Sequence, residues 1–104
     1  MDDYPAEIFR QLSIGANPNN TAEQRLSNLQ RVMTDGKGNY NAKVAAAWTI
    51  VALCQDENTP KNVKNEALAF VIGSGKQNAD IGAAAEQAKT LLKRKQQYAD
   101  YATL

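Results

Sequence analysis

The chain contains no histidine among its 104 residues and a single cysteine, Cys54. Histidine is the commonest general base near neutral pH and the commonest metal ligand. Its absence excludes Ser-His-Asp and Cys-His nucleophiles as well as histidine-containing zinc sites. One cysteine cannot form an intrachain disulfide, and we interpret it as a buried, inert thiol. We therefore expect no catalytic, cofactor-binding or metal-binding residues, and predict that the protein is not an enzyme.

Long apolar runs and an excess of one charge are also missing. No stretch approaches the roughly 18 consecutive apolar residues that indicate a membrane-spanning helix. The formal net charge of +1 provides no bulk attraction for nucleic acid or for a membrane surface. The acidic N-terminal residues lack the basic-then-apolar order of a signal peptide. We therefore expect a cytoplasmic protein that does not bind a membrane.

What the sequence does contain is a series of helical patterns, and no strand-like alternation extends over a useful length. Residues 41–55, NAKVAAAWTIVALCQ, are apolar nearly all round, which is typical of a helix enclosed by other helices. We take this segment as the central element and Trp48 as one of its core anchors. The prediction is an all-α, compact five-helix domain covering residues 1–104, either an irregular bundle or a short α-α stack.

Several residues mark the expected helix boundaries. Thr21 and Gln24 have the spacing of a capping box, which predicts a helix that begins directly after Thr21. Thr59 and Pro60 read as an N-cap followed by proline at the first helical position. Gly73 is expected to end that helix in a left-handed conformation. The last helix is expected from about residue 80 to residue 101. Its predicted apolar side consists of Ile81, Ala84, Ala85, Ala88, Leu91 and Leu92.

One stretch in the second half of the chain resembles a known repeat family. Residues 56–73, DENTPKNVKNEALAFVIG, resemble the second helix of a HEAT-type repeat, in which an Asp/Asn turn precedes a Val-Lys-x-x-Ala helix. Three segments that begin near residues 42, 62 and 80 each place a branched residue before an alanine-containing patch, so the resemblance extends over residues 41–92. It implies stacked helical pairs that present a concave surface to a protein partner.

Two loops resemble ligand-binding motifs but lack the residues that such motifs need. Residues 73–76, GSGK, would require a glycine at the position of Phe70 and a Ser or Thr at the position of Gln77 to bind phosphate. Residues 34–41, TDGKGNYN, would require glycine at Tyr40 and a bidentate glutamate at Ala46 to bind calcium. Both are interpreted as plain connections between helices.

The C-terminal helix carries the candidate interaction surface. Its basic residues could contact phosphates and its tyrosines could stack on bases, whereas the tyrosines and the terminal leucine also suit a protein interface. The candidate residues are Lys89, Lys93, Arg94, Lys95, Tyr98, Tyr101 and Leu104.

These observations predict a small protein–protein interaction module, an adaptor or regulatory subunit that self-associates through the C-terminal helix. The alternative is a weak nucleic-acid-binding protein that uses the basic residues of the same helix. Elimination of the other classes supports the first hypothesis, because the sequence predicts a well-formed core and contains no catalytic or cofactor motif. The identity of a protein partner does not follow from the sequence.

Overall fold

The computed structural model describes residues 6–35 and 39–102, with side chains described through Arg94. These residues form five helices and no strand, which confirms the predicted all-α, five-helix fold. The helices are α1 (Ala6–Ala16), α2 (Ala22–Thr34), α3 (Tyr40–Gln55), α4 (Lys61–Ser74) and α5 (Ala79–Ala102). Within the described part of the chain, no helix combines the length and the apolar character needed to cross a membrane.

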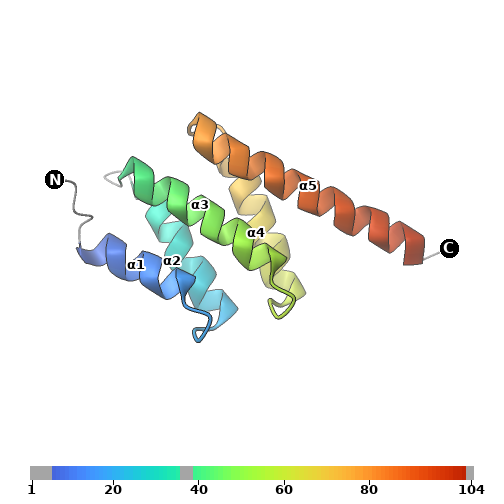
Figure 1. Cartoon of the computed structure of the whole chain (residues 1–104), viewed down its shortest axis with the longest axis horizontal. Coiled ribbons are helices and arrows are strands. Elements are labelled where there is room, and N and C mark those ends of the chain that lie inside the picture. The colour runs from blue at the N-terminus through green and yellow to red at the C-terminus, as the bar shows by residue number, and fades with distance from the viewer. Residues whose placement is uncertain (1–5, 36–38, 103–104) are drawn as a thin grey trace.

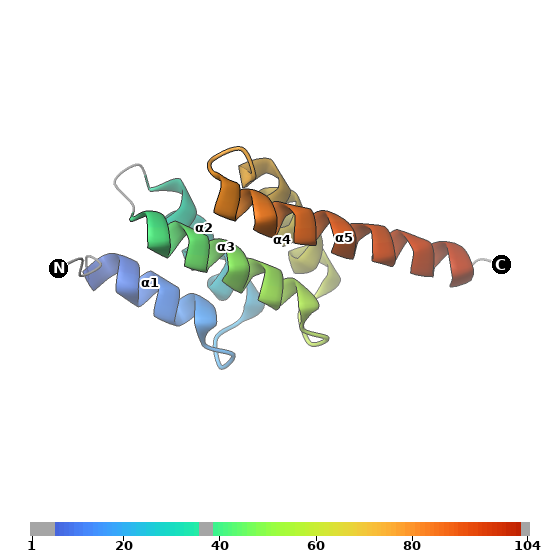
Figure 2. The same cartoon turned by 45° about the horizontal axis from the view of Figure 1, so that its top comes forward.

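The helices are arranged in two layers. Helices α1, α3 and α5 lie side by side and run in the same direction, while α2 and α4 return behind them (Figures 1 and 2). The molecule measures 55 × 31 × 17 Å along its principal axes. A thickness of 17 Å between Cα atoms suits two helical layers, because packed helix axes lie about 8–10 Å apart.

The core lies between the two layers and draws on all five helices. Small residues let the helices approach closely: Ala42, Ala46 and Ala47 of α3 are fully buried. At Gly15 of α1 an added Cβ would overlap the side chain of Leu29. The largest fully buried side chains are Leu29, Met33, Ile50, Leu53, Ile81, Val32, Val63 and Val71.

The start of α2 confirms the predicted capping box. Thr21 Oγ1 accepts a hydrogen bond from the Gln24 backbone N–H at 3.2 Å, and the Thr21 backbone N–H donates to Gln24 Oε1 at 3.4 Å. These two bonds satisfy backbone groups that a helix start leaves without intrahelical partners. At the start of α3, Asn39 Oδ1 accepts from the Asn41 backbone N–H at 2.8 Å in the same way.

The prediction for Thr59 was wrong. The N-cap of α4 is Pro60, and no side chain caps this helix end. Thr59 instead turns back toward the preceding helix, where its hydroxyl donates to the Leu53 backbone oxygen at 2.8 Å. Thr59 is only 6% exposed, so it ties the α3–α4 connection to the end of α3.

The prediction for Gly73 also needs correction. Helix α4 continues through Gly73 to Ser74, and no glycine among the described residues has a positive φ. In this connection the glycine with a packing role is Gly75, where an added Cβ would lie 2.7 Å from the Cβ of Ala85 on α5. Residue 75 is therefore small because α5 passes directly over it.

Candidate interaction surface

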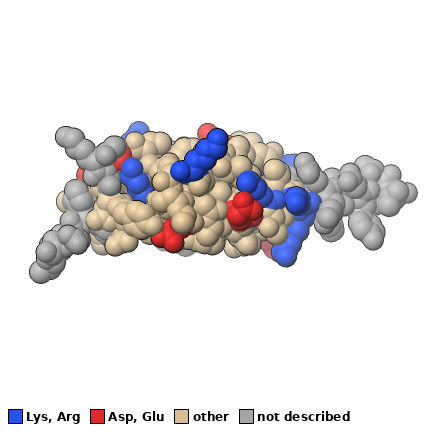
Figure 3. Space-filling model, turned by 90° about the horizontal axis from the view of Figure 1, so that it is seen from above, with Lys and Arg blue, Asp and Glu red and all other residues tan. Residues whose placement is uncertain are grey.

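The structure places the first part of the predicted surface on the exposed side of α5. Lys89, Lys93 and Arg94 are all exposed, and Figure 3 shows Lys and Arg side chains gathered where the described surface ends on this helix. Lys89 pairs with Glu86 at 3.1 Å. Lys93 and Arg94 take part in neither of the two ion pairs found among the described residues. The structure thus groups two cations that form no ion pair with the described residues at this point of the helix.

The remaining predicted residues lie beyond the described side chains. Lys95, Tyr98 and Tyr101 belong to the helical backbone of α5, but their side chains are outside the described part of the chain, as is Leu104. The backbone itself is informative, because α5 continues well past the other helices (Figures 1 and 2).

The two parts of α5 differ in how they meet the rest of the molecule. Ile81, Ala84, Ala85 and Ala88 are at most 3% exposed and pack into the core. Leu91 and Leu92 are half-buried and mark the point where the helix leaves its neighbours. The apolar side of α5 predicted from sequence is therefore confirmed up to Leu92, with burial that decreases toward its end.

The second candidate surface is on α3, and sequence reasoning missed it. The predicted enclosure of α3 was wrong, because Trp48 is 42% exposed. Trp48 lies in a row of exposed residues, called here the outer stripe. The outer stripe consists of Asn41, Ala45, Trp48, Ala52 and Gln55.

The physical reason lies in the two-layer arrangement. Helices α1 and α5 flank α3 on either side and α2 and α4 lie behind it, so none of the described helices covers its front (Figure 2). The signal that could have revealed the stripe was weak. Its two end residues, Asn41 and Gln55, are polar and fourteen residues apart, close to four helical turns and therefore on the same face. The alanines between them resemble core residues.

Two other large side chains are exposed near this layer. Phe9 of α1 is 62% exposed and Tyr40 at the start of α3 is 51% exposed. The Tyr40 hydroxyl donates a hydrogen bond to the carboxylate of Asp80 on α5, which links the first turns of the two helices. This hydrogen bond to Asp80 raises the pKa of Tyr40 above its ordinary value.

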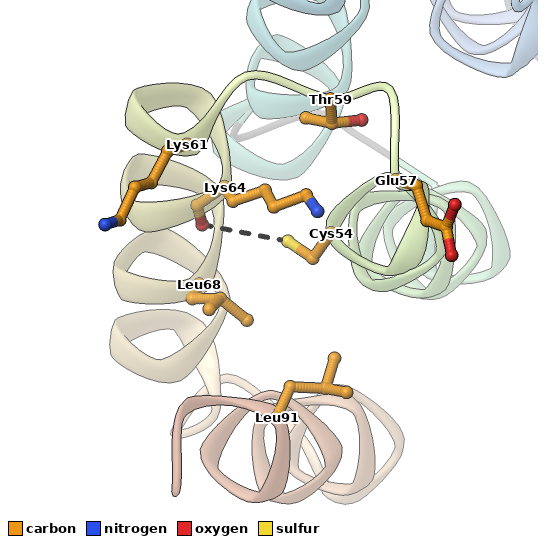
Figure 4. Close-up of a pocket in the computed structure, with 7 residues that line it drawn as sticks. All are labelled: Cys54, Glu57, Thr59, Lys61, Lys64, Leu68 and Leu91. Atoms are coloured by element: carbon orange, nitrogen blue, oxygen red, sulfur yellow. Dashed lines mark hydrogen bonds between the residues drawn. The ribbon is translucent and has the colours of Figure 1, made fainter. Parts of the chain in front are cut away.

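A pocket of about 430 Å³ lies where the end of α3, the first half of α4 and the middle of α5 meet. Its lining residues are Cys54, Glu57, Thr59, Lys61, Lys64, Leu68 and Leu91 (Figure 4). Cys54 is 8% exposed and its Sγ lies 3.9 Å from the Lys64 backbone oxygen. Burial raises the pKa of this thiol to about 11, and the positive charge of Lys64 opposes the shift only in part. A thiol with a raised pKa is a poor nucleophile.

The interpretation of residues 73–76 as a plain connection holds only for Gly75 and Lys76. Gly73 and Ser74 belong to α4, and Ser74 Oγ donates to the Phe70 backbone oxygen at 2.8 Å. Among the described side chains, those of residues 6–35 and 39–94, no three His, Cys, Asp or Glu come together in a way that could hold a metal ion.

Comparison with known proteins adds no identification. No family model, no curated protein and no solved structure matches the chain. The functional argument therefore rests on the surfaces described above.

Proposed function

We propose that the protein is a small, non-enzymatic protein–protein interaction module of the cytoplasm that binds a partner through the outer stripe of α3. The observation that carries the proposal is the 42% exposure of Trp48 at the centre of a row without any charged residue. Tryptophan is enriched and charge is depleted at the centres of protein interfaces, where a few aromatic residues provide most of the binding energy.

The scaffold supports this proposal. Alternate helices form the two layers, as in a short HEAT-like α-α stack, which is the finer form of fold that we propose. Such stacks use the surface of one helical layer to bind partners. The outer stripe lies on the middle helix of the three-helix layer, so a partner docked there can also contact α1 and α5.

The proposal includes self-association through the C-terminal end of α5. The support is the backbone, which continues past the other described helices as a regular helix to Ala102 (Figure 1). In sequence, Tyr98 follows Leu91 by seven residues, about two helical turns, so it continues the row that begins in the core. A second copy that packs along this row would cover it.

Substitution of Trp48 tests the outer stripe. A tagged copy that carries Trp48→Glu should lose the partner that the unchanged protein retains from its native cells, because a charge is placed at the centre of the contact. Ala69→Glu is the matched control, since Ala69 is also exposed but lies on α4 in the other layer. Circular dichroism verifies that both variants fold. Identical sets of retained proteins for all three copies would contradict the proposal.

Self-association has a separate test. Sedimentation of the full chain across a dilution series should show a concentration-dependent dimer. The variant with both Tyr98→Glu and Tyr101→Glu should remain a monomer at every concentration. A full chain that sediments as a monomer at every concentration would contradict self-association. It would not affect the proposal that a partner binds the outer stripe.

A second candidate function is weak binding of single-stranded nucleic acid. The exposed and unpaired Lys93 and Arg94 favour it. Binding of an oligonucleotide should then weaken steeply with salt, and reversal of both charges, Lys93→Glu with Arg94→Glu, should abolish it. The matched control reverses two exposed lysines elsewhere, Lys61→Glu with Lys76→Glu. Equal loss in both double variants would indicate only an unspecific effect of net charge.

A further inference from the structure

The pocket between α3, α4 and α5 separates apolar from charged surface. Leu68 of α4 and Leu91 of α5 face each other across its lower part, and Cys54 lies directly above them (Figure 4). Burial keeps the Cys54 thiol protonated, so it contributes neutral surface to the wall. One end of the pocket is therefore lined by two leucines and an uncharged sulfur.

A positive charge lies beside Cys54, on the side away from the two leucines (Figure 4). The side chain of Lys64 runs from α4 toward the end of α3, above the two leucines, whereas Lys61 and Glu57 point away from the space between them (Figure 4). Lys64 is half-buried and belongs to neither ion pair of the described residues. Its ammonium group ends beside Cys54 (Figure 4), where its positive charge opposes part of the rise in the pKa of the thiol. An unpaired ammonium group beside apolar walls is complementary to an anion that carries an aliphatic chain.

We propose that this pocket binds an aliphatic carboxylate of medium chain length, with the carboxylate on Lys64 and the alkyl chain between Leu68 and Leu91. The volume of about 430 Å³ lies within the range of about 300–1,000 Å³ usual for small-molecule pockets. The site goes beyond the proposed protein contact, since it is formed by α4, α5 and the end of α3 and includes no residue of the outer stripe.

Cys54 makes the site directly measurable, because it is the only cysteine of the chain. An occupant between Leu68, Leu91 and Lys64 covers the thiol. Octanoate is the probe, and the readout is the labelling rate of Cys54 by methyl methanethiosulfonate, a small uncharged reagent, followed by mass spectrometry at mildly alkaline pH. We expect octanoate to slow labelling in a saturable manner. Octanol, which has the same chain without the charge, should require at least about tenfold higher concentration.

Two variants test whether the ammonium group of Lys64 binds the carboxylate. Lys64→Met keeps the aliphatic stem and removes the ammonium group, so octanoate should lose its advantage over octanol. Lys61→Met is the matched control, because Lys61 borders the pocket but its ammonium group points away from the space beside Leu68 and Leu91, and this variant should keep that advantage (Figure 4). Labelling without a probe, together with thermal unfolding, verifies that both variants retain a buried Cys54 and a folded chain.

The following outcomes would overturn the proposal. The first is that octanoate does not protect Cys54 at any concentration below its aggregation limit. The second is that octanol protects equally well, and the third is that Lys64→Met and Lys61→Met behave alike. Protection by an acidic, leucine-containing peptide without protection by octanoate would overturn it as well, and would assign the pocket to a protein partner. Faster labelling would indicate unfolding by the probe and also speaks against a bound carboxylate. None of these results bears on the partner retained through Trp48, so this proposal and the proposed function fail independently.

Discussion

The two sides of α3 have similar residues and opposite environments. On the inner side, Ala42, Ala46 and Ile50 are fully buried, whereas on the outer side Ala45 and Ala52 are exposed and Trp48 is 42% exposed. Alanine occurs on both sides, and the largest side chain is on the exposed one. In an alanine-rich helix, the neighbouring helices therefore decide which side is the core, and the hydrophobicity of the side chains does not.

The sharpest test of this contrast is the same substitution at adjacent positions. Ala46→Glu buries a charge without a partner, and we expect a loss of about 3–5 kcal/mol in the free energy of unfolding, or no folding at all. Ala45→Glu places the same charge in water, and its effect should stay within about 0.5 kcal/mol. Urea denaturation followed by circular dichroism measures both. Similar losses for the two variants would mean that the outer stripe is covered in the folded protein.

Glycine gives the next largest contrast between buried and exposed helix surface. Gly15→Ala forces a methyl group into Leu29, and the expected loss is about 1–3 kcal/mol. Gly73→Ala places the methyl group in open space within a helix, so the free energy of unfolding should rise by about 0.4–1 kcal/mol. Thermal unfolding resolves the opposite signs. Stabilisation by Gly15→Ala would contradict the close contact between α1 and α2.

A third pair concerns two threonines that each donate to a backbone oxygen. Thr59→Val removes the buried hydroxyl that donates to the Leu53 oxygen and leaves that oxygen with the longer bond from the Asp56 N–H at 3.3 Å, so we expect a loss of about 0.5–1.5 kcal/mol. Thr49 donates to the Ala45 oxygen at 2.7 Å on the solvent side of α3. Thr49→Val should therefore cost less than about 0.5 kcal/mol, because water replaces the hydroxyl. Chemical denaturation compares the two, and equal costs would contradict the role assigned to Thr59.

The smallest expected effect depends on pH and concerns the exposed contact between α3 and α5. The hydrogen bond to Asp80 raises the pKa of Tyr40 in the folded state above the unfolded value of 10.0. The contact therefore contributes fully below pH 10 and is lost as the pH rises through the folded pKa. The stability of the unchanged protein relative to Tyr40→Phe should be constant below that pH and decline above it. A difference that is independent of pH up to complete ionisation of tyrosine would contradict this hydrogen bond.

Much of the fold followed from local patterns. The capping box at Thr21 and Gln24 and the apolar row on α5 from Ile81 onward were both predicted correctly. Capping depends on residues only three positions apart, and an apolar row depends on the helical repeat alone. Thr59 was assigned wrongly because its hydrogen-bond partner, the Leu53 oxygen, is fixed by how α3 and α4 meet. Gly73 was assigned wrongly because α4 continues through it to Ser74.

The candidate sites divide in the same way. The basic residues at Lys93 and Arg94 were found from sequence, since charged side chains on a surface helix need no tertiary information. The outer stripe was missed because its alanines and its tryptophan are also typical of a core. The pocket at Cys54, Lys64 and Leu91 joins residues from three helices, so no local pattern could predict it.

The sequence by itself determined that the described chain folds into five helices and where most of them begin, because helix caps and helical periodicity depend on residues only a few positions apart. Its lack of histidine by itself excluded histidine-dependent chemistry. Only the tertiary structure decided which side of α3 faces water and which side chains surround Cys54. The reason is that burial is a property of neighbours distant in sequence, and α3 is flanked on two sides and backed on a third while its fourth side stays open.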